Sequence, residues 1–189
     1  MELSSNQFPK VYEALDINLS DLGCVMLDLE PSVDLIRLGN EMESSKSLYY
    51  SGNKERFWID GFVGKNPHVT LLYGLLGPAV DYKHLIDKVL EGWELKSVEV
   101  EKIGYFESPY PDEKYRCVVA HVKVTPKLLE GHQRLEFLPH INTFPGYKAH
   151  FTLAYIKKDN VGIDCIKMFS SIVGKKFSIK QKLNLGGNK

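Results

Sequence analysis

The sequence predicts an α+β fold of two similar lobes, in which antiparallel sheets line one central cleft and helices lie outside. Two observations predict it. The six-residue stretch His68–Tyr73 (HVTLLY) recurs as His150–Tyr155 (HFTLAY). Around each copy the hydrophobic pattern indicates the same order, which is strand, helix, histidine strand, helix and strand. An internal duplication explains both, and we expect the two histidine strands to face each other across the cleft.

The recurrence of this stretch is far from chance. Random placement of six His and four Thr in 189 residues gives only about 0.13 His-x-Thr triplets. Both copies are rich in β-branched and aromatic residues, which is typical of strands. Alternate side chains of a strand share a face. The first copy therefore places His68, Thr70 and Leu72 on one face, and the second copy places there His150, Thr152 and Ala154.

The first half begins with a strand predicted at 23–30 and a helix at 31–42. The apolar side of this helix carries Val33 and Ile36, with Leu35 as a further candidate. Residues 43–64 are polar and aromatic, and they predict a long loop before the first histidine strand. A helix follows at about 82–91, with Asp81 as its N-cap and a stripe made of Tyr82, Leu85, Ile86 and Val89. A strand at 97–106 completes this half.

The second half opens with a strand at 115–124. Thr125 and Pro126 then start a helix that runs to about residue 137, with Thr as the N-cap. After the second histidine strand, a helix is expected at 161–173, ended by Gly174, and then an alternating strand at 177–185. We therefore expect an N-terminal extension (1–21), one bilobal domain (22–185, with halves at about 22–106 and 115–185 that can exchange strands) and a loose tail (186–189).

The balance of charged residues indicates which kind of partner the protein binds. The chain has 24 basic and 24 acidic residues and a formal net charge of zero. A protein that holds long nucleic acid by charge is usually more basic, so a small nucleotide is the better expectation. Three widely spaced cysteines (Cys24, Cys117 and Cys165) indicate reduced thiols in a cytoplasmic protein. The sequence shows neither a signal peptide nor an apolar run that could span a membrane.

Two His-x-Thr strands suit the chemistry of a phosphodiester. Imidazole titrates near neutral pH, so one ring can take a proton from the nucleophile, water or a ribose 2′-hydroxyl, while the other protonates the leaving oxygen. The threonine hydroxyls can donate to the non-bridging oxygens.

Zinc binding is the competing interpretation of the two histidines. A zinc site needs a third ligand, and neither strand carries an Asp, Glu or Cys beside its His. We expect no cofactor and no metal, and structural or surface roles for His84, His121, His132 and His140.

The paired motif resembles the two-histidine (2H) phosphoesterase superfamily over roughly residues 22–185. The resemblance implies a bilobal fold and metal-independent phosphodiester hydrolysis. It implies that His68 and His150 are catalytic, and that Thr70 and Thr152 hold the phosphate. The approaches to the two histidines, Asn66-Pro67 and Tyr147-Lys148-Ala149, are also similar. Ala149 departs from the family, where proline is common, and this affects only a backbone preference.

Within the superfamily, Asn66–Gly74 (NPHVTLLYG) most resembles phage enzymes that cleave the cyclic oligonucleotide signals of bacterial CBASS defence. This implies a cyclic di- or trinucleotide substrate with 3′-5′ links and a location in the host bacterial cytoplasm. Aromatic and basic residues near the cleft are candidates for substrate binding, with ordinary packing or a solvated surface as the alternative for each: Tyr49, Tyr50, Trp58, Tyr110, Tyr147, Lys148 and Arg116. Alternative functions are a phosphodiesterase for RNA 2′,3′-cyclic phosphates or 2′-5′ oligoadenylates, and a non-catalytic nucleotide-binding sponge.

Overall fold

The computed structural model describes residues 21–43, 46–52, 61–107, 113–142, 146–159 and 164–186. Trp58 and Tyr110, most of the predicted N-terminal extension and most of the tail lie outside these ranges. The strands are β1 (Gly23–Leu29), β2 (His68–Leu75), β3 (Ser97–Glu107), β4 (Tyr115–Val122), β5 (His150–Lys157) and β6 (Lys176–Gly186). The helices are α2 (Val33–Glu43), α3 (Lys83–Val89), α4 (Pro126–Leu135) and α5 (Cys165–Met168), with 3-10 helices η3 (Ala79–Tyr82) and η4 (Phe169–Ile172).

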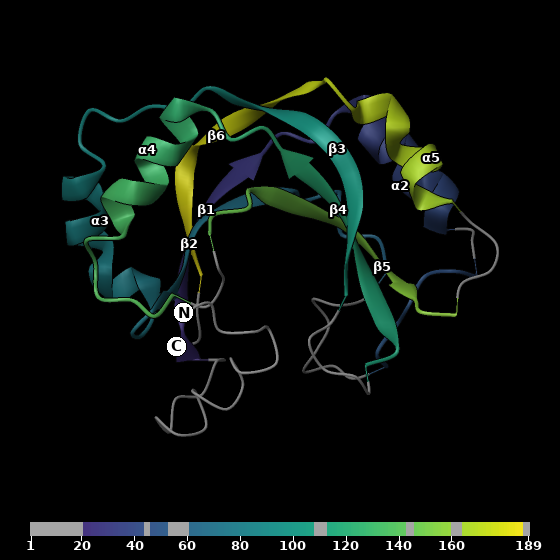
Figure 1. The fold of residues 1–189 in the computed structure, drawn as a ribbon, viewed down its shortest axis with the longest axis horizontal. Helices are drawn as coiled ribbons and strands as arrows, with labels where there is room; N and C mark the ends of the chain where they lie inside the picture. The colour runs from purple at the N-terminus through teal and green to yellow at the C-terminus, as the bar shows by residue number, and fades with distance from the viewer. Residues whose placement is uncertain are drawn as a thin grey trace.

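The strands form one antiparallel sheet in the order β2-β1-β6-β3-β4-β5. It has two wings, β2-β1-β6 and β3-β4-β5, joined where Ser97–Glu99 of β3 pair with 176–178 of β6. β6 comes from the second half of the sequence but lies beside β1, and β3 from the first half lies beside β4. The wings bend into an arch (Figure 1), and β2 contacts β5 although the two strands are at opposite ends of the order.

The helices lie outside this arch in two groups at opposite ends of the molecule (Figure 1). At one end α4 packs on β2 and contacts α3. At the other end α2 contacts η4, the 3-10 turn that continues α5. The arrangement is the predicted α+β fold, with antiparallel strands inside and helices outside. No helix in the described part of the chain is long and apolar enough to cross a membrane.

One hydrophobic core runs through both wings. Phe151 of β5 and Phe177 of β6 are buried, and their ring centroids lie 5.2 Å apart. Phe62, which precedes β2, stacks on Phe169 of η4 at 6.4 Å. These contacts join residues from the two sequence halves, so burial of apolar surface ties the wings together.

The prediction for the buried side of α2 was wrong for Val33 and Ile36, while the further candidate Leu35 is buried. Val33 is 83% exposed and Ile36 is 42% exposed, whereas Leu35, Leu38 and Met42 face the core. The helix begins at Val33, and Ser32 Oγ accepts a hydrogen bond from Leu35 N at 3.1 Å. Residues 35, 38 and 42 are spaced three and four positions apart, so they share one face of the helix, and this face is the buried one.

The structure also corrects the helix after β2. Asp81 is not its N-cap, because 79–82 form a 3-10 turn and Tyr82 occupies the cap of α3 with no side-chain hydrogen bond. Leu85, assigned to the apolar stripe, is 45% exposed, while Ile86 is buried. A 3-10 turn has three residues per turn, so it shifts the phase of the helix that follows.

The other predicted helix boundaries have mixed outcomes. The N-cap of α4 is confirmed, since Thr125 Oγ1 accepts from Leu128 N at 3.2 Å and Pro126 follows it. The helix predicted at 161–173 is shorter in its described part, where α5 covers Cys165–Met168 and η4 covers Phe169–Ile172. Gly174 has a φ of 78°, a left-handed conformation that ends this segment as predicted.

Candidate active site

The two histidine strands border one cleft. β2 supplies His68 and β5 supplies Thr152, and the cleft between them has a volume of about 710 Å³. Its described lining comes from both wings and from the segment before β2: Asp28, Phe62, Val63, Lys65, Asn66, Pro67, His68, Thr152, Tyr155, Lys180 and Asn184. The fold therefore brings together two strands whose histidines lie 82 positions apart in the sequence.

A β-bulge occurs at the same motif position in both strands. In β2 the register passes from Met26↔Thr70 to Val25↔Leu72 and skips Leu71. In β5 it passes from Val119↔Thr152 to Val118↔Ala154 and skips Leu153. An inserted residue reverses the alternation of side chains beyond it.

These bulges correct the predicted cleft face. Leu72 and Ala154 were expected beside the histidines, but both are buried in the core. Tyr155 instead lines the cleft with Thr152. Tyr73 takes the equivalent place in β2 and is 36% exposed. The residues expected to share a face are therefore His-x-Thr-x-x-Tyr in both strands.

The residues across from each motif strand repeat only in part. Tyr73 pairs with Cys24 and Tyr155 pairs with Cys117, so cysteine faces tyrosine in both halves. All three cysteines are free thiols, as predicted. The histidines differ in their partners, because Asp28 lies across from His68 whereas His121 lies across from His150.

His150 is held by its surroundings. Its Nδ1–H donates to the carbonyl of Lys148 at 2.7 Å, and a carbonyl can only accept, so Nε2 carries the lone pair. The ring of Phe106 meets His150 edge to face at 4.6 Å and meets His121 at 5.3 Å. Burial lowers the pKa of His150, and the charge of His68 lowers it further, while the bond to Lys148 opposes both. The hydrogen bond thus orients the ring, and burial favours its neutral form.

The cleft carries polar residues that the sequence analysis did not single out. Asn184 Nδ2 donates to Asp28 Oδ1 at 3.0 Å, joining β6 to β1 beside His68. Lys180 of β6 adds a positive charge to the lining. Lys65 also lines the cleft, and its Nζ forms a salt bridge with Glu43 Oε1 at 3.0 Å. Asp28 could have been found from the alternation Cys24, Met26, Asp28 within an otherwise buried strand. Lys180 had no comparable signal.

Two stacked rings hold the bulge of β2. Tyr147 lies flat against His132 at 4.1 Å, and its hydroxyl donates to the carbonyl of Thr70 at 3.0 Å. Nδ1 of His132 donates to the next carbonyl, that of Leu71, at 2.6 Å. Burial raises the pKa of Tyr147. The structure thus gives Tyr147 a packing position behind the motif, and gives His132 the structural position that was expected.

Backbone groups hold the bulge of β5. The carbonyl of Leu153 accepts hydrogen bonds from Val63 N and Gly64 N, both at 2.9 Å. Tyr155 N donates to Gly61 O, also at 2.9 Å. Since residues 61–67 lead directly into His68, the segment that precedes one catalytic candidate fixes the strand of the other.

The remaining predicted substrate residues fall in different places. Lys148 is exposed beside His150, and its charge contributes to a lower pKa of His121, of which burial is the main cause. Arg116 lies on the face of β4 opposite His121, with its guanidinium 5.5 Å from the ring of Tyr105, so it points away from the cleft. Tyr49 and Tyr50 line a second pocket near the end of β5.

Across the described ranges, no group of three or more His, Cys, Asp and Glu is placed to hold a metal ion.

Solved structures share this fold. The chain resembles Usb1 of Kluyveromyces marxianus with a TM-score of 0.54 and 10% identity, covering 88% of this chain and 94% of that one. Usb1 of the same organism with uridine monophosphate gives a TM-score of 0.54 and 11% identity, with 89% and 95% covered. Usb1 has the 2H phosphoesterase-like fold, so the predicted fold is confirmed. No protein-family profile and no curated protein sequence matches the chain.

Proposed function

We propose that this protein is a metal-independent phosphodiesterase that cleaves a nucleotide substrate with two histidines as base and acid. One observation carries the proposal: His68 of β2 and Thr152 of β5 line one cleft, and the two motif strands contact each other. Two imidazoles around one phosphate can remove and deliver a proton in a single displacement. The 2H-like fold supports this class of reaction.

We assign His150 as the general base. Its Nδ1–H is held by Lys148, which leaves the Nε2 lone pair to accept a proton from the nucleophile. Its lowered pKa keeps it unprotonated near neutral pH. His68 is then the acid that protonates the departing oxygen.

The charge that builds on the phosphate needs donors. The hydroxyls of Thr70 and Thr152 lie two residues beyond the histidines on rigid strands, and each can donate to a non-bridging oxygen. Lys180 adds positive charge to the same cleft. Donors held on strands lose little freedom during the reaction, and this strengthens their effect.

The leading substrate is a cyclic oligonucleotide second messenger with 3′-5′ links, whose cleavage would counteract bacterial CBASS immunity. The similarity of Asn66–Gly74 to phage enzymes of this class supports it, as does the formal net charge of zero. This role places the protein in the cytoplasm of an infected bacterium.

An RNA end is the second candidate substrate. The fold likeness to Usb1, including its structure with uridine monophosphate, favours a phosphodiesterase for RNA 2′,3′-cyclic phosphates or 2′-5′ oligoadenylates. A nucleotide-binding sponge on the same fold is the non-enzymatic alternative.

A chromatographic assay in excess EDTA tests these candidates together. The panel contains cyclic di- and trinucleotides, an RNA fragment ending in a 2′,3′-cyclic phosphate, and a 2′-5′ oligoadenylate. Cleavage of the cyclic oligonucleotides alone supports the leading substrate, and cleavage of either RNA-type substrate alone supports the second. Turnover that appears only after a divalent metal is added contradicts the metal-free mechanism. Tight binding without turnover under both conditions supports the sponge.

A further inference from the structure

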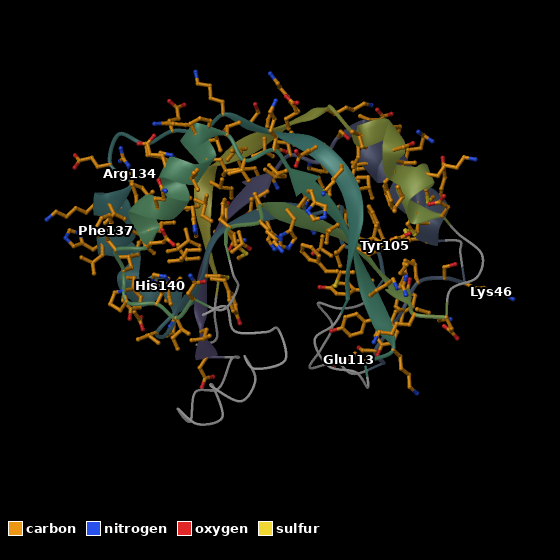
Figure 2. All side chains as sticks on the ribbon, in the orientation of Figure 1. Lys46, Tyr105, Glu113, Arg134, Phe137 and His140 are labelled. Carbon is orange, nitrogen blue, oxygen red and sulfur yellow. The ribbon has the colours of Figure 1, made fainter. Side chains whose placement is uncertain are left out.

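A second pocket lies beside the end of β5, apart from the cleft. It has a volume of about 450 Å³, within the range of small-molecule sites. Two tyrosines, three lysines and two carboxylates form its described lining: Tyr49, Tyr50, Glu113, Lys114, Lys157, Lys158 and Asp159. Figure 2 shows Glu113 at this side of the arch, far from Phe137 and Arg134 at the other end.

A row of tyrosine rings connects this pocket with the cleft. Tyr155 lines the cleft, and its ring centroid lies 5.5 Å from that of Tyr115. The ring of Tyr115 lies 5.2 Å from that of Tyr49, which lines the second pocket. The bulge at Leu153 is what places Tyr155 on the cleft face, so the row depends on the same feature that shapes the candidate active site.

Backbone hydrogen bonds fix the pocket walls. Tyr49 N donates to the carbonyl of Tyr155 at 2.9 Å, and Lys157 N donates to the carbonyl of Ser47 at 3.0 Å. Lys158 N donates to the carbonyl of Lys114 at 2.9 Å. These bonds hold the backbone of the lining residues Tyr49, Lys114, Lys157 and Lys158 in place before any ligand arrives, which reduces the ordering cost of binding.

The lining suits one nucleotide. Tyrosine faces stack on any base, and lysine ammonium groups attract phosphate. The carboxylates of Glu113 and Asp159 oppose phosphate but accept hydrogen bonds from the amino groups of a base. Three ammonium groups against two carboxylates leave a positive balance.

We propose that the second pocket binds a nucleotide of the substrate beyond the one that is cleaved, and that the tyrosine row guides the strand between the two sites. This inference rests on the proposed function and narrows its substrate to oligonucleotides long enough to occupy both sites. A dinucleotide fills the cleft alone, whereas a longer linear or cyclic oligonucleotide also reaches Tyr49 and Tyr50.

The experiment measures kcat/KM for linear oligouridylates of increasing length, from the dinucleotide to the hexanucleotide, and for cyclic di- and trinucleotides. Two variants disturb the second pocket, Tyr50→Ala and the charge reversal Lys114→Glu with Lys158→Glu. Phe137→Ala and Lys88→Glu are matched controls, because these residues are exposed on the far side of the fold. Thermal unfolding confirms that every variant folds.

We expect the wild-type kcat/KM to rise at least about fivefold with length, the gain that one stacked base supplies. Both pocket variants should lose this gain and retain the wild-type rate on the dinucleotide, while the controls keep the full length dependence. A wild-type rate independent of length, or pocket variants that keep the gain, would overturn the inference.

Failure of the proposed function gives a different result, which is that no substrate is cleaved by the wild type. Fluorescence anisotropy with a labelled hexanucleotide then tests the pocket by itself. At least about fivefold weaker binding by both pocket variants, with unchanged binding by the controls, supports the pocket. Equal binding by all proteins contradicts it.

Discussion

The strands β2 and β5 carry the same motif and the same bulge, but they are supported in different ways. In β2 the side chains of Tyr147 and His132 donate to the carbonyls at and before the bulge. In β5 the backbone N–H groups of Val63 and Gly64 donate to the carbonyl of Leu153, and the carbonyl of Gly61 accepts from Tyr155 N. Each strand lies at the end of the sheet order, so its outer carbonyls need partners from elsewhere. A duplicated motif keeps its local geometry while the two supports diverge.

The surroundings of the two histidines differ more than their supports. His150 packs against Phe106, pairs across the sheet with His121 and donates to Lys148. His68 is exposed and lies across from Asp28. The two copies of the motif therefore place their histidines in different surroundings, which the neighbouring strands supply. The predictions below break or sharpen this comparison.

Loss of either imidazole is expected to have the largest effect. His68→Ala and His150→Ala should each lower kcat/KM by at least about 100-fold, because each removes one of the two proton transfers. The double variant should fall little further, since the two groups act as a unit. His84→Gln, on the exposed surface of α3, is the matched control. Turnover by the double variant at the wild-type rate would rule out the two-histidine mechanism.

The threonines are expected to contribute equally despite their different supports. Thr70→Val and Thr152→Val should each lower kcat by about 100-fold, because valine keeps the branched shape but donates no hydrogen bond to the phosphate. Thr→Ser at either position restores the donor and should recover most of the rate. If only one valine variant is impaired, phosphate binding belongs to one strand alone.

The pH dependence should reveal the difference between the histidines. Burial and the charge of His68 hold the pKa of His150 below its ordinary 6.5, so the acid limb of kcat/KM is expected below that pH. As the pH falls, His150 takes up a proton in the unfolded chain before it does so in the folded protein. The free energy of unfolding therefore also decreases as the pH falls from 6.5 to the lower pKa of His150 in the folded protein. Phe106→Ala hydrates the ring and should move the limb to higher pH. An unchanged limb, checked by NMR titration of His150, would argue against burial as the cause.

The smallest effect is expected from the support of β2. Tyr147→Phe removes the hydroxyl that donates to Thr70 O and should lower the free energy of unfolding by about 1 kcal/mol. KM should stay within about twofold, because the ring remains stacked on His132. Tyr82→Phe removes a similar but exposed bond to Leu76 O and should cost less. A large rise in KM with unchanged stability would instead make Tyr147 a substrate-binding residue.

The motif made much of this structure predictable. The repeated frame and the repeated order of elements predicted all six strands, and the resemblance predicted the fold. The cap at Thr125 followed from local chemistry. These features depend on short stretches of sequence, where propensity and periodicity agree.

The bulges and the neighbouring strands could not be predicted in the same way. A bulge at Leu71 or Leu153 depends on donors from 132 and from 63–64, which are distant in the sequence. Strict alternation therefore placed Tyr155 on the wrong face. Lys180 and Asn184 entered the cleft because β6 lies beside β1, and this pairing depends on the topology of the whole sheet. The assignment of Val33 and Ile36 to the buried side of α2 failed because the buried face is decided by packing against distant elements such as η4.

The position of β6 between β1 and β3 also has a kinetic consequence. The hydrogen bond from Asn184 to Asp28 joins residues 156 positions apart, and the whole pairing of β1 with β6 is similarly distant. Closing such long loops is slow, and sheets built from distant pairings have high contact order. We therefore expect the wing that carries His68 to be completed late in folding. We expect refolding after dilution from denaturant to regain nucleotide binding only in its slowest phase, after the secondary structure has formed.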